Sequence, residues 1–177
     1  MENTHFSEED KRFMSLALDE AEQALASGDY PVGAVLPIDG VLFGKARNSI
    51  FTESQPAAHA EQKLLNSIST ELRKKIRKEA DYDICLYTTL EPCLMCLGVV
   101  ILNRVTRIVI SCPDPHGGAT NINPDNLGSF YADHWPIIEI GLMKEIAVNR
   151  IIKFLKTEKF MSWDRMLTEF SKMKKGW

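Results

Sequence analysis

Residues 84–111, with the sequence ICLYTTLEPCLMCLGVVILNRVTRIVIS, decide the fold of this chain. A compact β-prone run at 84–89 leads through Pro92 into an apolar stretch at 93–102, whose length suits a helix. A second β-prone run follows at 105–111. Strands that alternate with helices in this way predict an α/β layered domain with a partly parallel sheet.

The sequence on either side of this stretch supplies the other predicted elements. Ser7 can cap a helix that Gly28 ends, and the turn dipeptide Asp39-Gly40 joins two antiparallel strands at 31–36 and 41–44. The remaining elements are a helix through His59 and Leu65, a strand at 137–140, an amphipathic helix at 143–160 and a short final helix at 163–173. Together the strands predict a mixed five-stranded sheet.

The composition is that of an ordinary globular domain. Its 177 residues are 45% hydrophobic and 25% charged, which is enough for one domain with a real core. No apolar run reaches the roughly 18 residues that a membrane helix needs, and the N-terminal MENTHF does not resemble a secretory signal. Two of the four cysteines have the spacing of metal ligands, so we expect no disulfide framework. We therefore expect a protein of the cytoplasm with no membrane partner.

Charge is distributed unevenly along the chain, although the net charge is only −3. Residues 1–30 carry eight acidic side chains against two basic ones, whereas residues 139–177 carry nine basic against five acidic. A short basic run also occupies residues 73–78. Such runs are usually solvated helix faces, but they are also candidate contacts for phosphate groups.

Two short motifs carry the chemistry. His59-Ala60-Glu61 is followed about thirty residues later by Pro92-Cys93-Leu94-Met95-Cys96. One imidazole and two thiolates leave the fourth position of a tetrahedral zinc ion open for water, which is typical of a catalytic site. Zinc lowers the pKa of that water toward neutrality, and the nearby Glu61 carboxylate is free to move protons. The whole pattern resembles the His-x-Glu…Pro-Cys-x-x-Cys signature of zinc deaminases, and this resemblance implies hydrolytic removal of an amino group from a nucleobase ring.

Other interpretations of these residues are possible. A Cys-x-x-Cys pair alone often marks a structural zinc knuckle or a redox pair, and Cys85 and Cys112 could complete a closed structural site. Cys85, however, lies in the apolar run Ile84-Cys85-Leu86-Tyr87, where a small buried residue is the ordinary occupant. A redox pair would leave His59 and Glu61 unexplained. We therefore favour the catalytic site.

The chain resembles the cytidine deaminase superfamily of zinc hydrolases, and within it the bacterial tRNA adenosine deaminases and their nucleobase-deaminating relatives. The resemblance covers roughly residues 7–160. It is carried by Pro31-Val32-Gly33-Ala34-Val35, Arg47-Asn48, His59-Ala60-Glu61, the LYTTLEPC segment at 86–93, Cys96 and Asp114-Pro115-His116-Gly117-Gly118. It implies a three-layer α-β-α cytidine-deaminase-like fold, a zinc-dependent deaminase domain at 1–160 with a helical extension packed on it at 161–177, and a homodimer.

The resemblance also implies roles for individual residues. His59, Cys93 and Cys96 would hold Zn²⁺, and Glu61 would be the catalytic proton shuttle. Asn48 would hydrogen-bond the substrate base or its sugar, Asp114 would meet the substrate's flank, and Val32 and the backbone near Ala60 would line the base pocket. Two features depart from the tRNA-acting pattern: His116 stands where a lysine is usual, and residues 119–122 lack the small-residue pattern of the tRNA-acting members. The tail at 159–164 also differs and resembles the aromatic lids of cytosine and guanine deaminases.

Three functions follow from these features. The favoured one is conversion of adenosine to inosine in tRNA, indicated by the 114–118 loop and the basic C-terminal third. The alternative is deamination of a free base or nucleoside such as guanine or cytosine, indicated by the overall acidity and the aromatic tail. A non-catalytic zinc-binding partner subunit is the third, and the retention of Glu61 argues against it.

Overall fold

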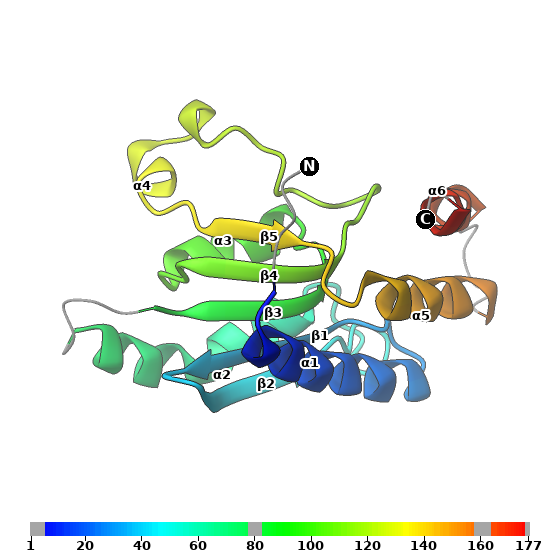
Figure 1. The fold of residues 1–177 in the computed structure, drawn as a ribbon, viewed down its shortest axis with the longest axis horizontal. Helices are drawn as coiled ribbons and strands as arrows, with labels where there is room; N and C mark the ends of the chain where they lie inside the picture. Colours follow the sequence, from blue (N-terminus) through cyan, green and yellow to red (C-terminus); the bar gives the residue numbers. More distant parts are fainter. Residues whose placement is uncertain (1–5, 78–82, 158–163, 176–177) are drawn as a thin grey trace.

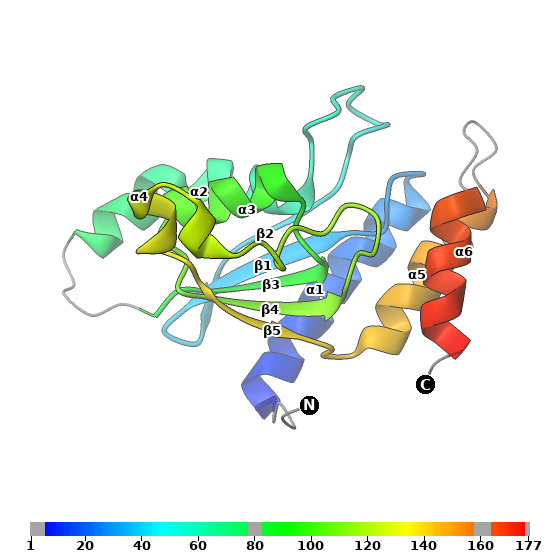
Figure 2. The same cartoon turned by 90° about the horizontal axis from the view of Figure 1, so that it is seen from above.

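The computed structural model describes residues 6–77, 83–157 and 164–175. Its centre is a mixed five-stranded sheet with helices on both faces (Figures 1 and 2). The strands in chain order are β1 (Gly33–Ile38), β2 (Val41–Arg47), β3 (Cys85–Leu90), β4 (Arg107–Cys112) and β5 (Ile137–Ile140). Their order across the sheet is β2-β1-β3-β4-β5. The predicted fold class and the mixed five-stranded sheet are confirmed.

Strand direction follows the lengths of the connections. β1 pairs antiparallel with β2 through the tight turn at Asp39 and Gly40, and antiparallel with β3 on its other side. β3, β4 and β5 are parallel to one another, with Leu86 opposite Ile108 and Ile108 opposite Ile138. Parallel neighbours need long crossovers, and a helix lies in each one.

Helices form a layer on each face of the sheet. The helices α2 (Ala60–Ile76) and α3 (Leu94–Leu102) cover one face, and α1 (Glu8–Ala26) and α5 (Lys144–Thr157) lie on the other (Figure 2). Because successive strand side chains point to opposite faces, Leu86 belongs to the core under α2 and α3, whereas Tyr87 belongs to the core with α1 and α5.

The C-terminal helix α6 (Asp164–Lys175) packs against α5, outside the sheet layers (Figure 2). Phe170 of α6 is fully buried in the same hydrophobic core as Phe154 of α5 and Phe13 of α1. A long apolar side chain buried in this way ties the helix to the rest of the chain. The division into units at 1–160 and 161–177 stays a prediction.

Several element boundaries differ from those predicted. β2 continues to Arg47, and α3 begins at Leu94, with Cys93 as its N-cap residue. The 3₁₀ helix η1 (Pro124–Asn126) and the short helix α4 (Ser129–Ala132) were not predicted, since segments of three and four residues show no periodicity. Trp163 and the end of the predicted 143–160 helix lie outside the described residues. Among the described helices, none has the length and apolar character needed to cross a membrane.

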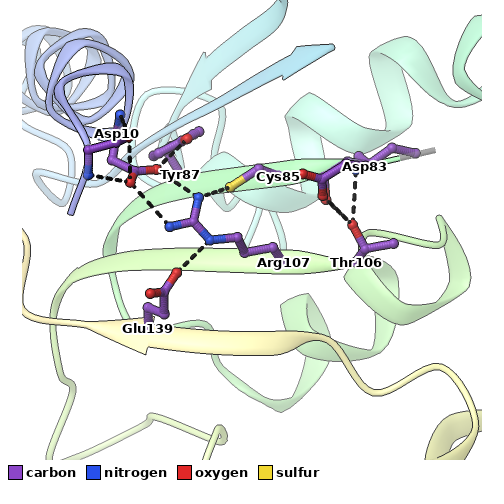
Figure 3. Close-up of polar contacts among 9 residues, drawn as sticks. Asp10, Asp83, Cys85, Tyr87, Thr106, Arg107 and Glu139 are labelled. Atoms are coloured by element: carbon purple, nitrogen blue, oxygen red, sulfur yellow. Dashed lines mark hydrogen bonds and ion pairs between the residues drawn. The ribbon is translucent and has the colours of Figure 1, made fainter. Parts of the chain in front are cut away.

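A buried polar cluster joins α1 to the edge of the sheet where β3 and β4 begin (Figure 3). The Asp10 carboxylate, 4% exposed, accepts hydrogen bonds from the Ser7 backbone, the Tyr87 hydroxyl and the Arg107 guanidinium. Arg107 also donates to Glu139 of β5. Burial alone would raise the pKa of Asp10, but the hydrogen bonds from Arg107 and Ser7 outweigh it and hold this pKa well below its usual range.

Candidate active site

The candidate site lies at the opposite edge of the sheet, beyond the carboxyl ends of β3 and β4. Ligand sites of α/β sheets are generally found at this edge. His59 is the N-cap residue of α2 and Cys93 is the N-cap residue of α3, and neither side chain makes a capping hydrogen bond. Because α2 and α3 are neighbours on one face, their N-terminal ends bring the two side chains together. Cys96 follows one turn into α3.

The geometry of these three residues fits a zinc ion. The Nδ1 atom of His59 lies 3.6 Å from the Sγ atom of Cys93 and 3.6 Å from that of Cys96. Tetrahedral ligands at the usual Zn–N and Zn–S lengths would lie roughly 3.6 Å apart. The three ligand atoms all lie within 4.8 Å of one another, and no fourth His, Cys, Asp or Glu among the described residues joins this group. The set therefore has the composition of an open site.

The surroundings of Cys93 favour the thiolate form of its side chain. Hydrogen bonding from Cys96 lowers the pKa of Cys93 to about 4, with a further contribution from His59. The same pairing raises the pKa of Cys96, and contact with Cys93 raises the pKa of His59. The partial positive charge at the N-terminal end of α3 stabilises a negative charge at these positions. Metal binding requires both thiols to ionise, so the loading of the site depends on pH.

Glu61 lies beside the cysteines without joining the ligand group. Its side chain is 3% exposed and accepts a hydrogen bond of 3.2 Å from the Thr88 hydroxyl on β3. The Sγ atom of Cys96 lies 3.6 Å from its Oε2 atom. Burial raises the pKa of Glu61. A carboxyl group with a raised pKa is suited to both accepting and returning a proton near neutral pH.

The other two cysteines belong elsewhere. Cys85 and Cys112 lie in the hydrophobic core with α1 and α5, on the face of the sheet away from α2 and α3. Burial raises the pKa of each thiol to about 12. Both therefore behave as small buried apolar residues, and they do not form the closed structural site that the sequence left open.

A cavity of about 330 Å³ opens beside the candidate zinc site. Its walls include three of the residues that the sequence predicts for substrate binding, namely Val32, Asn48 and Asp114. Asn48 is buried, and its Oδ1 atom accepts a hydrogen bond of 3.2 Å from the Ile50 backbone, which holds the amide at the wall. Ala60 is fully buried in the core under α2 and does not line the cavity. Residues not predicted from the sequence complete the lining: Tyr30, Ile50, Leu90, Glu91, His116, Gly117 and Met166.

Glu91 is a site residue that sequence reasoning missed. Its carboxylate accepts hydrogen bonds from the backbone of Asp114 (2.9 Å) and of Thr120 (3.0 Å), so it holds the 114–120 loop against the site. A Cβ atom on Gly118 would lie 2.4 Å from the Glu91 carboxylate, which explains the glycine at this position. The sequence signal that could have identified Glu91 as a site residue was its position beside Pro92 and Cys93, directly after a strand.

The helix α6 forms one wall of the cavity. Met166 lines it, and Glu169, one turn further on, has its Oε2 atom 3.9 Å from Nδ1 of His116. This separation is too long for a hydrogen bond, and the pair is charged only when His116 is protonated. The C-terminal helix therefore contacts both the cavity and the loop that carries Asp114.

The fold and the three-ligand site define a zinc-dependent hydrolase, and comparison with known proteins identifies its family. Residues 7–112 match the family described as the cytidine and deoxycytidylate deaminase zinc-binding region. The chain belongs to this family and is a zinc-dependent hydrolytic deaminase. The tRNA-specific adenosine deaminase of Bacillus subtilis is 34% identical over 137 residues, which cover 77% of this chain and 83% of the relative. That of Haemophilus influenzae is 32% identical, covering 85% of both.

Solved structures agree on the fold. A structure from studies of A-to-I editing by tRNA:A34 deaminases at the wobble position of transfer RNA has a TM-score of 0.66 and 29% identity, covering 78% of this chain and 98% of its own. The guanine deaminase from Nitrosomonas europaea has a TM-score of 0.66 and covers 81% of this chain and 83% of its own. At 20% identity the second likeness shows the shared fold alone.

Proposed function

We propose that this deaminase converts adenosine to inosine in transfer RNA. The observation that carries the proposal is the similarity, above 30% identity and over most of both chains, to tRNA-specific adenosine deaminases. A match of 137 residues in a chain of 177 necessarily includes the zinc motifs and the 114–118 loop. The reaction replaces the exocyclic amine of adenine with oxygen from water and releases ammonia.

In this proposal His59, Cys93 and Cys96 hold the zinc ion, as their spacing allows. When bound, zinc acts as a Lewis acid that lowers the pKa of water toward neutrality. Glu61 accepts a proton from water as the oxygen bonds to C6 of the base, and then gives this proton to N1. A second proton, from the new hydroxyl group, passes through Glu61 to the amine. The C6–N bond then breaks and ammonia leaves.

The cavity residues orient the base for this step. Asn48, held by its contact with the Ile50 backbone, has amide hydrogens that can donate to the base or its sugar. Val32 offers an apolar surface to the ring, and Asp114 meets the flank of the substrate. Holding the base in register with Glu61 lowers the entropic part of the barrier.

A homodimer is also part of the proposal. Within the apolar stretch of α3, Leu97, Val100 and Ile101 are buried in the core of the chain itself. Leu94 and Leu102, by contrast, are 67% and 58% exposed. Exposed large apolar side chains on one helix support a contact with a second copy. The cytoplasmic location stays a prediction.

One observation favours the alternative substrate, a free base or nucleoside such as guanine or cytosine. Met166 of α6 forms part of the cavity wall, and Glu169 of the same helix lies near His116. A cavity of about 330 Å³ that is closed on one side by a helix suits a single base better than a polynucleotide loop.

The two functions are separated by product analysis with zinc-loaded protein. The full chain is incubated with tRNA and, separately, with adenosine, with guanine or cytosine, and with the nucleosides of these two bases. The Glu61→Gln variant is the inactive control. We expect inosine in the digested tRNA from the wild type and none from the control. Release of ammonia from guanine or cytosine, without inosine in tRNA, would replace the proposal with the free-base function.

A further inference from the structure

A basic groove lies far from the cavity, where α2 and α3 end. It has a volume of about 510 Å³, and its walls come from the last turns of α2, from the end of α3 with the following turn, and from α4. Three guanidinium groups line it: those of Arg73 and Arg77 on α2, and that of Arg104 just after α3. We call these three residues and the exposed Phe130 of α4 the arginine groove.

The structure separates these arginines from the lysines of the same basic run. Lys74 forms an ion pair with Glu71 (2.8 Å), and Lys75 forms one with Asp39 (2.6 Å). Among the described residues, by contrast, no acid forms an ion pair with any of the three positive charges of the groove.

The arginines are also arranged as a surface. Arg73 and Arg77 are four residues apart, so their side chains lie on one side of α2. Arg104 comes from a different segment, and its guanidinium carbon lies 4.7 Å above the centre of the Phe130 ring. This cation–π contact restrains Arg104 without neutralising its charge. Planar guanidinium groups of this kind match the geometry of phosphate oxygens.

The distance from the catalytic residues suits an extended polyanion. Arg73 follows His59 by fourteen residues along α2, which corresponds to about 21 Å of helix at 1.5 Å per residue. This length corresponds to several base pairs of a helical stem. A nucleotide in the cavity and a paired stem next to it could therefore contact the cavity and the arginine groove together.

We propose that the arginine groove binds the phosphate backbone of a helical RNA stem that flanks the nucleotide held in the cavity. The inference rests on the proposed function, because it assigns an RNA substrate to the same enzyme. The groove contributes affinity and orientation by charge, whereas the cavity selects the base. Phosphates bound by the three arginines release counterions, so binding weakens as salt concentration rises.

The experiment measures binding of a fluorescent RNA stem-loop by anisotropy at several salt concentrations. Arg73→Gln with Arg77→Gln is the test variant. Lys11→Gln with Arg12→Gln is the matched control, since it removes two exposed charges from α1, outside both basic segments of the chain. We expect the slope of log Kd against log salt to fall by about two in the test variant and to stay unchanged in the control. Arg104→Gln should lower it by about one.

Two results would overturn the proposal. One is a test variant whose salt slope and affinity match those of the control. The other is a change in oligomeric state by sedimentation in the test variant alone, which would assign the arginine groove to contact with a second copy of the chain. Inosine formation separates this proposal from the proposed function. If the wild type binds RNA through the groove but makes no inosine, the proposed tRNA function fails and the RNA-binding role of the groove stands. If the wild type and the test variant form inosine equally and bind RNA equally, the proposed function stands and the role of the arginine groove in RNA binding is removed.

Discussion

The replacement Arg107→Met tests how α1 is held on the sheet. The Arg107 guanidinium joins the Asp10 carboxylate of α1 to Glu139 of β5, with an N–O distance of 2.7 Å to Asp10 (Figure 3). The Asp10 side chain is only 5% exposed, and that of Arg107 is 25% exposed. The replacement leaves a buried carboxylate without its cation, and removing one partner of a buried pair costs about 3–5 kcal/mol. Because Arg107 is partly exposed, we expect about 3 kcal/mol.

The stability that the Asp10–Arg107 ion pair contributes depends on pH. The depressed pKa of Asp10 stabilises the wild type above the unfolded value of about 3.9, and this stability is lost as pH falls through the lower folded value. In Arg107→Met the folded pKa of Asp10 rises, so this contribution is absent. The difference in free energy of unfolding between wild type and variant should therefore be greatest near neutral pH and shrink below pH 4.

Urea unfolding at pH 7 and at pH 3, together with thermal scans, measures both effects. A loss of about 3 kcal/mol corresponds to a fall in Tm of roughly 6–12 °C for a chain of this size. Arg150→Met is the control: this arginine is 20% exposed, but its partner Glu22 is 53% exposed, so the cost should be about 1 kcal/mol or less. The reasoning is refuted if the two variants lose equal stability, or if the loss in Arg107→Met persists unchanged at pH 3.

Further predictions concern the site. Glu61→Gln should retain one zinc per chain by elemental analysis. Its turnover should fall at least about 10²-fold, since an amide cannot act as a base. A turnover near that of the wild type would mean that Glu61 does not transfer the proton. Gly118→Ala should weaken substrate binding, measured as a raised KM, because its Cβ atom would lie 2.4 Å from the Glu91 carboxylate and displace the loop. Gly98→Ala, where nothing lies within 4 Å of the added atom, should leave KM unchanged. Equal effects of the two alanines would contradict this role of the loop.

The candidate metal site was the part most readily predicted from the sequence. Cys93 and Cys96 are three residues apart at the start of a helix, and His59 precedes another helix, so local spacing alone places their side chains. The five strands were likewise predicted from β-prone runs, because each one is bounded by turn residues or by a helix. The short elements η1 and α4 had no comparable signal.

Residues that act through distant contacts could not be found in this way. Arg107 and Asp10 are 97 positions apart, and only the packing of α1 on the sheet brings them together. Met166 reaches the cavity because Phe170, one turn later, anchors α6 in the core. The basic run at 73–78 showed charge, but only the structure separates the lysines that pair with acids from the arginines that line a groove.

The central claim is an open, three-ligand zinc site, and X-ray absorption spectroscopy of the zinc-loaded protein tests it most directly. We expect one zinc per chain with two sulfur neighbours at about 2.3 Å and two nitrogen or oxygen neighbours at about 2.0–2.1 Å, one of them from His59 and the other from solvent. Cys112→Ser should leave this spectrum unchanged, and Cys96→Ser should abolish it. Three or four sulfur neighbours in the wild type would mean a closed structural site and would contradict the account.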